Sequence, residues 1–352
     1  MTPNTINSSI KFANERFQLA VLGKAQNIPP IWFMRQAGRY HSHYRKLKEK
    51  YSFLELCKNP ELAAEVALGP IKEFGFDVSI LFSDILFPLE AMGMGLDYNP
   101  GPVINNQIQS ESDFLKLRDL DSIVLHLEFQ KKALEYTREI LPKNVSLIGF
   151  VGGLWTLLNY AISNKQNGYL SNPKSNPKLI KLFYDKIIPV LKENVRLQLE
   201  GGAEIVMILD TLGGDLSPDW FEELVVKPVI EITINYHGRI GYYTKGSTLD
   251  QMKSLKNISG LAGIGVDHRF SIENLLKYKV SPGFLQGNFD QSLLFLPTDE
   301  FIQAVKKYLY PIKNLTREER IGWISGLGHG IKPGTPEDNV KRLVDLIREE
   351  FQ

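Results

Sequence analysis

Cysteine is almost absent from this sequence: the chain has 352 residues and one cysteine, Cys57. A single thiol cannot form a disulfide bond within the chain, and it cannot build a zinc site that needs two thiolate ligands. Cys57 lies in the segment SFLELCKNPELAAE (52–65), whose apolar spacing predicts a helix. We therefore expect Cys57 to pack in the hydrophobic core and not to act as a nucleophile.

An excess of charge of either sign is also missing. The 41 basic and 40 acidic side chains give a formal net charge of +1. A general nucleic-acid binder relies on a basic excess that releases phosphate counterions, so this class of protein is excluded. Any anionic ligand must be bound locally, by a few well-placed basic groups.

Long apolar runs are absent as well. No window reaches the length that a bilayer requires, and the first residues contain no apolar block typical of a secretory signal. We therefore expect a cytoplasmic protein that has neither a membrane nor a nucleic acid as its partner.

Eight short apolar runs recur along the chain, and helical spacing fills the stretches between them. The runs cover residues 30–34, 77–83, 145–151, 204–209, 239–244, 261–266, 283–288 and 320–325. Continuous apolar runs that alternate with helices are typical of parallel strands buried on both faces. The pattern predicts an α/β fold, a (β/α)8 TIM barrel formed by a single domain over residues 1–352, with a doubly wound open sheet as the alternative.

Two segments do not fit the repeating unit. We expect residues 1–27 to form a lead-in helix before the first strand. The long gap over residues 88–144 contains GMGLDYNPGPVINN (93–106), which we expect to be a loop that precedes the next helix.

Candidate catalytic residues lie where the predicted strands end, because every βα loop of a barrel opens onto the same face. Arg35 and Arg39 follow the first run, and arginine offers a planar fork of donors that matches a pair of anionic oxygens. Asp84 follows the second run, where an unpaired carboxylate is costly and needs a cation or a ligand N–H group. Ion pairs with neighbouring side chains are the structural alternative for all three residues.

Three further features have competing interpretations. Lys245 in YYTKGST is either a Schiff-base lysine of an aldolase-like barrel or a surface lysine. His41 and His43 look like a metal-binding pair, but the charged residues after them favour the solvated start of a helix. The GLGHG segment (326–330) either holds a phosphate in its backbone N–H groups or presents His329 as an acid, a base or a hydrogen-bond donor.

The segment PPIWFMRQAGRYHSHYR (29–45) resembles the first signature of the uroporphyrinogen decarboxylase family. Further motifs follow in the order typical of that family: GFDVSILFSDIL, LIGFVGGLWTLLNY, ILDTLGG, YTKGST, LQGNFD and GLGHG. The resemblance extends from about residue 28 to residue 350. It implies a single-domain barrel, usually a homodimer, that removes the carboxyl groups from the four acetate side chains of uroporphyrinogen III without metal or organic cofactor.

The resemblance also implies roles for particular residues. Arg35 and Arg39 match clamps on the substrate carboxylates, and Asp84 matches the aspartate that faces the four pyrrole N–H groups. The other positions that match substrate-binding residues are Gln36, Ala37 and Gly38, which shape the loop, Tyr44 beside the cleft, and Tyr160, Thr211 and His329. Of these, Tyr160 and His329 are also expected to take part in catalysis.

The expected chemistry has a simple physical basis. Loss of CO2 from an acetate on a pyrrole requires an electron sink, which the ring supplies once it is protonated at the adjacent carbon. The resulting intermediate is cationic, so a fixed carboxylate such as that of Asp84 stabilises it strongly in a site that excludes water. The proton comes either from an arginine or from an ordered water.

The chain departs from the family pattern at four places. Leu154 replaces a proline before WT, and Thr211 replaces a serine but keeps its hydroxyl group. His-Ser-His at residues 41–43 stands where Leu-Pro-Glu is common. The loop after Tyr160 (161–176) is shorter and has fewer glycines than usual.

Two other readings compete with the resemblance. A cobamide-dependent methyltransferase shares the barrel, but it binds zinc through histidine and cysteine ligands near the last strands. Cys57, alone and early in the chain, cannot complete such a site. A catalytically inactive porphyrin-binding homologue stays as the alternative, and turnover by the purified protein separates it from the enzyme.

Overall fold

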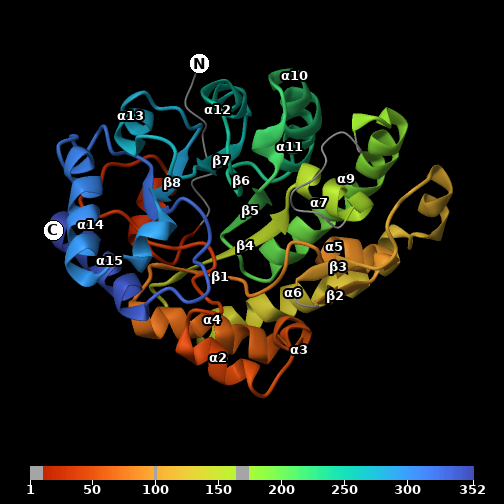
Figure 1. The fold of residues 1–352 in the computed structure, drawn as a ribbon. Coiled ribbons are helices and arrows are strands. Elements are labelled where there is room, and N and C mark those ends of the chain that lie inside the picture. Colours follow the sequence, from red (N-terminus) through yellow and green to blue (C-terminus); the bar gives the residue numbers. More distant parts are fainter. Residues whose placement is uncertain (1–10, 99–100, 164–173) are drawn as a thin grey trace.

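A curled parallel sheet forms the centre of the molecule (Figure 1). The computed structural model describes residues 11–98, 101–163 and 174–352. Seven strands pair in the order β1-β4-β5-β6-β7-β8-β9. They are β1 (Val78–Ile80), β4 (Ser146–Gly152), β5 (Ile205–Asp210), β6 (Ile240–Thr244), β7 (Leu261–Gly265), β8 (Phe284–Phe289) and β9 (Trp323–Leu327). Each expected run from the second to the eighth therefore contains or overlaps a strand of one parallel sheet.

The first expected strand, residues 30–34, is not regular. Its only ladder contact is a single parallel bridge between Ile31 and Ser325 of β9. On the other side, the Asp77 backbone N–H donates to the Ile31 carbonyl at 3.0 Å, and the Ile31 N–H donates to the Asp77 carboxylate at 2.9 Å. The strand prediction was therefore wrong for this run, because Pro30 has no N–H to donate and a side chain takes up that of Ile31. The segment nevertheless lies between β9 and β1.

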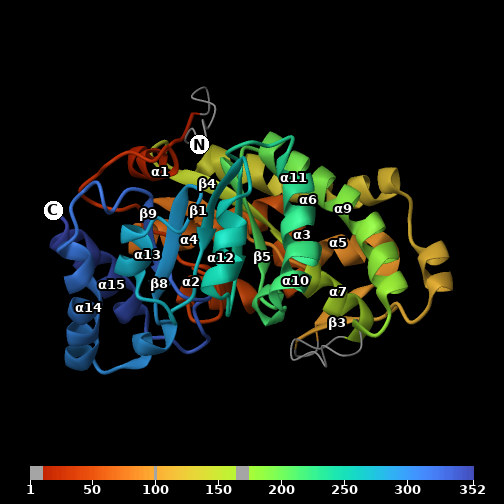
Figure 2. The ribbon, with the colours of Figure 1, turned by 90° about the horizontal axis from the view of Figure 1, so that it is seen from above.

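Helices lie on the outside of the sheet, as Figure 2 shows from above. They are α1 (Glu15–Val21), α2 (Ser42–Lys48), α3 (Phe53–Lys58), α4 (Pro60–Phe74), α5 (Phe87–Leu89), α6 (Leu120–Ile140), α7 (Leu154–Ser163), α9 (Pro177–Glu200), α10 (Pro218–Phe221), α11 (Lys227–Thr233), α12 (Leu249–Lys256), α13 (Ile272–Lys277), α14 (Thr298–Lys313) and α15 (Glu337–Glu350). Short 3-10 or π turns are η1 (Glu90–Met94), η2 (Glu111–Lys116), η3 (Gly213–Asp215), η4 (Glu222–Val226) and η5 (Gln291–Phe295).

Local sequence explains the bounds of these helices. In α4, Asn59 caps the first turn by accepting from the Leu62 N–H, and Pro60 occupies the first helical position. The helix ends at Gly75, whose φ of 72° is a left-handed conformation that glycine adopts without strain.

The expected loop at residues 93–106 contains a β-hairpin. β2 (Leu96–Tyr98) and β3 (Pro102–Ile104) pair antiparallel, with Leu96 opposite Ile104. Both of these side chains are buried. Each of these strands is only three residues long, too short for the period-2 pattern of a strand to stand out from a loop.

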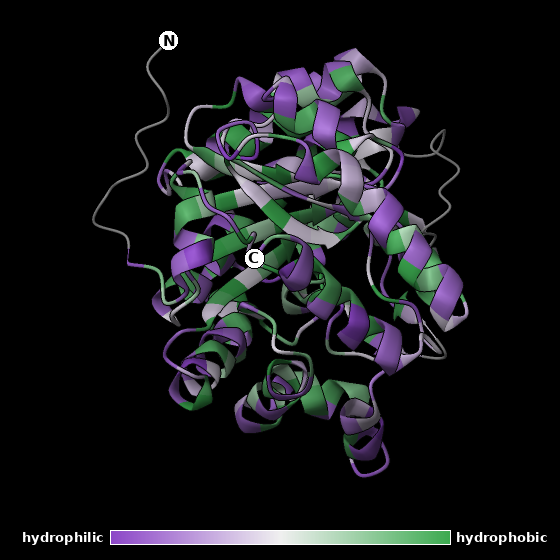
Figure 3. Cartoon of the chain, turned by 90° about the vertical axis from the view of Figure 1, so that its left-hand side faces the viewer, coloured by the Kyte–Doolittle hydropathy of each residue, from purple (hydrophilic) through white to green (hydrophobic). Residues whose placement is uncertain are grey.

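Burial along the strands agrees with the predicted parallel architecture. Every residue of β4 and of β7 is buried, and in Figure 3 the strands are mostly green to near white, whereas the outer helices mix green with purple. No helix among the described residues is long and apolar enough to cross a bilayer.

Candidate active site

The candidate residues gather at the carboxyl edge of the parallel sheet. Asp84 follows β1, Tyr160 lies on α7 after β4, Thr211 follows β5, and His329 follows β9. Because residues 31–34 lie between β9 and β1, Arg35 emerges between His329 and Asp84. The positive charge of Arg35 acts to lower the pKa of the Asp84 carboxyl and that of His329.

A buried glutamine anchors the loop that carries the two arginines. The Gln36 side chain accepts from the Phe33 N–H at 3.2 Å and donates to the Val78 carbonyl at 3.1 Å. Its backbone carbonyl accepts from the Tyr40 hydroxyl at 2.7 Å. The amide of Gln36 is therefore used within the protein and ties the loop to β1. Ala37 and Gly38, which follow it, are half-buried.

Arg35 and Arg39 are exposed, and neither forms an ion pair with a carboxylate in the part of the chain that the structure describes. Arg35 has a φ of 61°, so its backbone is in the left-handed region. A non-glycine residue seldom adopts this conformation without support from its surroundings. Both guanidinium groups are thus available to an anionic ligand, and the ion-pair alternative has no support.

Asp84 lies deep among protein atoms yet keeps some access to solvent. Its carboxylate accepts from the Leu86 N–H at 2.9 Å. Burial raises the pKa of the Asp84 carboxyl, while the Leu86 N–H, the Tyr98 hydroxyl and the charge of Arg35 act in the opposite direction. Within the described ranges no cationic side chain forms an ion pair with Asp84. The carboxylate therefore faces the site without a protein counter-ion.

His329 is held by a tyrosine that the sequence analysis did not single out. The Tyr243 hydroxyl lies 2.9 Å from His329 Nδ1 and donates to the Gly328 carbonyl at 2.8 Å. The two rings are stacked, with centroids 5.9 Å apart. Burial, Arg35 and Lys245 lower the pKa of His329 from 6.5 to about 4, so the imidazole is neutral at neutral pH.

A second carboxylate, Asp210, fixes the start of α7. Its Oδ1 accepts from the Thr156 N–H at 2.9 Å and from the Thr156 hydroxyl at 2.6 Å. Its Oδ2 accepts from the Tyr242 hydroxyl at 3.2 Å. The Leu212 N–H donates back to Thr156 Oγ1 at 3.1 Å, so α7 begins in a fixed position even though Leu154 replaces the expected proline.

Tyr160 and Thr211 lie on the two elements that this network joins. Tyr160 is buried on α7, and Thr211 is half-buried directly after β5. The rest of the loop after Tyr160, residues 164–173, lies outside the described residues.

Tyr44 and Cys57 belong to the packed wall beside Asp84. The Tyr44 ring lies 5.6 Å from that of Phe82, and burial raises the pKa of Tyr44 to about 12. Cys57 is fully buried on α3, which confirms its expected place in the core. Burial also raises the pKa of its thiol, which keeps the reactive thiolate form rare.

The structure places Lys245 at the surface and His41 in the interior. Lys245 is exposed on the loop after β6, as the surface reading expected. Ser42 does begin α2, but His41 is completely buried, so the expectation of a solvated start was wrong for this residue. Apolar packing from α4 covers the His41 ring, whose centroid lies 5.0 Å from that of Phe74.

The assembled site can bind a polyanion and stabilise a cation. Two unpaired guanidinium groups supply fixed positive charge at the rim, and Asp84 supplies negative charge within. The neutral imidazole of His329 adds a hydrogen-bonding group to the same site.

Comparisons with known proteins agree with this arrangement. A family model described as "Uroporphyrinogen decarboxylase (URO-D)" matches residues 12–350. The uroporphyrinogen decarboxylase of Geotalea uraniireducens is 36% identical over 349 residues, which cover 96% of this chain and 99% of the relative. That of Francisella philomiragia is 35% identical over 333 residues, covering 91% and 94% respectively.

A solved structure supports the fold. A methyltransferase from Methanosarcina mazei has a TM-score of 0.74 at 20% identity, over 97% of this chain and 99% of that one. At this identity the likeness shows the fold alone. The family match over most of the chain, together with relatives more than a third identical, shows that the chain belongs to the uroporphyrinogen decarboxylase family.

Proposed function

We propose that this chain removes the carboxyl groups from the four acetate side chains of uroporphyrinogen III and so produces coproporphyrinogen III in haem biosynthesis. One observation carries the proposal beyond family membership: among the described residues, Asp84 is a deep carboxylate that forms no ion pair, and the nearby Arg35 is not paired with a carboxylate either. Such a carboxylate suits a ligand that brings its own N–H donors and acquires positive charge during the reaction.

The proposed roles follow from charge and position. Arg35 and Arg39 hold the carboxylates of the substrate. The anchored turn at Gln36, Ala37 and Gly38 keeps the two arginine side chains in position. Asp84 accepts hydrogen bonds from the pyrrole N–H groups and stabilises the cationic intermediate formed when a pyrrole carbon is protonated. Because the Leu86 N–H already holds the Asp84 carboxylate in place, little reorganisation accompanies the appearance of that charge.

The remaining site residues bind and orient the substrate. Tyr160 and Thr211 offer hydroxyl groups from α7 and β5, and Tyr44 lines the wall beside Asp84. His329, neutral and oriented by Tyr243, acts as a hydrogen-bonding group and not as a cation. The reaction proposed here uses no metal and no organic cofactor.

We also propose that residues 30–34 take the place of an eighth strand and close the curled sheet into a (β/α)8-type barrel within a single domain over residues 1–352. The bridge from Ile31 to Ser325 of β9 and its hydrogen bonds with Asp77, directly before β1, support this closure. A cytoplasmic homodimer is the assembly that the family resemblance favours, and light scattering of the purified protein tests it.

The experiment that tests the function is an anaerobic incubation of purified, EDTA-treated protein with enzymatically generated uroporphyrinogen III. The products are then oxidised and separated by their number of carboxyl groups. A progression from eight to four carboxyl groups with nothing added supports the decarboxylase and its independence of cofactors. Binding without loss of carboxyl groups would favour the inactive porphyrin-binding homologue.

A further inference from the structure

Three potential metal ligands from different helices meet behind the loop that carries the arginines. His41 caps α2, Glu73 lies in the last turn of α4, and Glu337 lies in the first turn of α15. One ligand atom from each lies within 4.8 Å of the others. His41 Nε2 is 2.6 Å from Glu73 Oε2, and the His41 side chain is completely buried. The decarboxylation proposed above does not use these groups.

The charge of this cluster favours a cation. Glu337 accepts from the Ser42 N–H at 2.8 Å and pairs with the half-exposed Arg45 at 3.2 Å. Two carboxylates this close repel each other unless a positive charge lies between them. A divalent ion bound by both carboxylates and by His41 Nε2 supplies that charge.

The ligand types select the kind of ion. An imidazole and two carboxylates suit a transition metal such as zinc, which binds histidine nitrogen and carboxylate oxygen in tetrahedral geometry. Ligand atoms of one zinc ion are roughly 3.4 Å apart, so Glu73 must move away from His41 by somewhat less than an ångström. The Glu73 side chain is 45% exposed and has room to make this shift.

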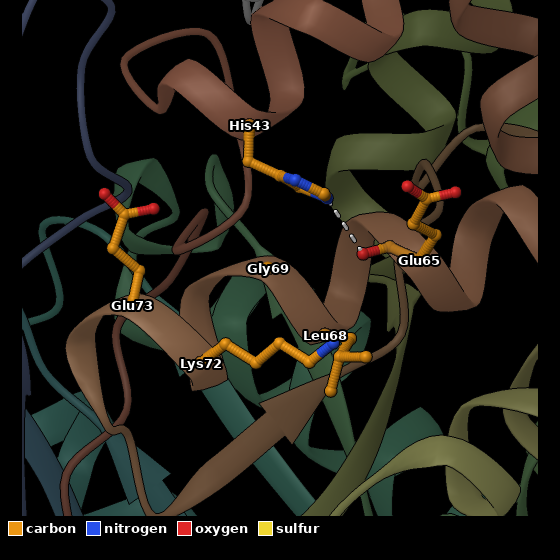
Figure 4. Close-up of a pocket in the computed structure, with 6 residues that line it drawn as sticks. All are labelled: His43, Glu65, Leu68, Gly69, Lys72 and Glu73. Atoms are coloured by element: carbon orange, nitrogen blue, oxygen red, sulfur yellow. Dashed lines mark hydrogen bonds between the residues drawn. The ribbon is translucent and has the colours of Figure 1, made fainter.

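A surface pocket of about 280 Å³ gives access to the cluster, and Glu73 and His43 line it together with Glu65, Leu68, Gly69 and Lys72 (Figure 4). The Lys72 ammonium points toward Leu68, away from the Glu73 carboxylate. His43 Nε2 is held only by a 3.3 Å contact with the Glu65 carbonyl. The open side of the cluster therefore offers space for water ligands and a second imidazole.

The burial of His41 is a second observation that points to a ligand. His41 is completely buried, and its Nδ1 has no hydrogen-bond partner among the described residues. A buried imidazole in an apolar position needs a compensating partner. We propose that His41, Glu73 and Glu337 form a zinc site that fixes α2 against α4 and α15. The ion is structural and takes no part in the decarboxylation.

The experiment measures zinc binding by calorimetry, with ZnCl2 titrated into the full chain after removal of metals with EDTA. His41→Leu restores the residue common in the family, and Glu73→Gln keeps an acceptor for His41 while removing the charge. His126→Ala is the matched control, because His126 is an exposed imidazole on α6 whose Nδ1 contacts only its own helix. Circular dichroism confirms that each variant is folded.

We expect one zinc ion per wild-type chain, and binding weakened at least about tenfold in both cluster variants but unchanged in the control. Zinc in excess should also raise the unfolding temperature of the wild type and not that of Glu73→Gln, since a ligand that binds only the folded state stabilises it. Absence of stoichiometric binding by the stripped wild type would overturn the proposal. So would binding that persists undiminished in either cluster variant.

Discussion

The side chain of Arg35 passes directly over Gly330. A Cβ atom on Gly330 would lie 2.5 Å from Cδ and 2.8 Å from Cγ of the arginine. Next to this contact, the Ile331 N–H donates to the Met34 carbonyl at 3.0 Å. The first and last loops of the chain are thus locked together, and glycine in the GLGHG segment leaves room for the arginine that precedes it by almost 300 residues.

We predict that Gly330→Ala weakens substrate binding. The φ of Gly330 lies outside the left-handed region, so alanine is compatible with the backbone and the clash falls on the flexible Arg35 side chain. Loss of one charged hydrogen bond should raise KM on the order of tenfold with a smaller change in kcat. Gly101→Ala is the control, because its added Cβ meets no atom within 4 Å. An unchanged KM would show that Arg35 does not depend on this contact.

The variant Asp84→Asn should be at least as stable as the wild type at neutral pH. Burial raises the pKa of Asp84 above 3.8, so the folded chain binds a proton more tightly than the unfolded chain. The contribution of Asp84 to the free energy of unfolding therefore falls as the pH rises from 3.8 to the raised pKa of the folded chain. Above that pKa, ionised Asp84 lowers the stability of the fold. Thermal unfolding checks this, with the difference between the proteins disappearing in acid. A less stable variant at neutral pH contradicts the assignment.

His329 should stay neutral over the whole neutral range. Its pKa of about 4 lies below the ordinary value of 6.5, and NMR titration of the ring resonances measures it directly. Between these two values the unfolded chain binds a proton that the folded chain does not, so His329 contributes to a loss of stability as the pH falls through this window. Arg35→Gln should raise the pKa of His329, because the substitution removes a positive charge that lowers this pKa. A titration midpoint of His329 near 6.5 in the wild type would contradict this prediction.

Thr156→Val tests the network that fixes α7. The substitution keeps the side-chain shape but removes the bond to Asp210 and leaves the Leu212 N–H without its acceptor. We expect a loss of about 1–3 kcal/mol in the free energy of unfolding. Turnover should fall too, because Tyr160 and Thr211 lie on the elements that the network joins.

Thr335→Val is the control for this prediction, since its buried hydroxyl donates only within a turn, to the Lys332 carbonyl at 2.8 Å. That variant should lose stability without the loss of turnover. Equal kinetic effects in the two variants would mean that α7 does not position the substrate.

Cys57→Ser should leave turnover intact while lowering stability. The thiol is fully buried and lies near Asp84 without contributing a reactive group. A serine hydroxyl there without a partner costs about 1–3 kcal/mol, and urea unfolding measures this loss. Cys57→Ala separates the effect of polarity from that of volume. A folded but inactive Cys57→Ser protein would restore the thiol as a participant in catalysis.

The sequence was most informative where a long apolar run made one element unambiguous. The runs that precede Asp84, Thr211 and His329 all belong to one parallel sheet, and a helix around Cys57 is present. The period of the apolar pattern reports burial, so it locates elements that are buried along their whole length. It did not reveal that the segment around Ile31 is too irregular to count as a strand.

Tertiary contacts account for the features that the sequence did not reveal. Tyr98, Tyr243 and Asp210 become meaningful only when distant segments bring them beside Asp84, His329 and Thr156. His41 was misjudged for the same reason, since the residues that bury it and pair with it come from α4 and α15. No local pattern encodes such contacts.

The most direct test of the account compares wild-type protein and Asp84→Asn in the same anaerobic incubation with uroporphyrinogen III, and counts the carboxyl groups left on the products. The account predicts that the wild type reaches four carboxyl groups without added metal or cofactor, whereas the folded variant leaves nearly all of the substrate with eight. Products with four carboxyl groups at equal rates from both proteins would contradict the central role of Asp84.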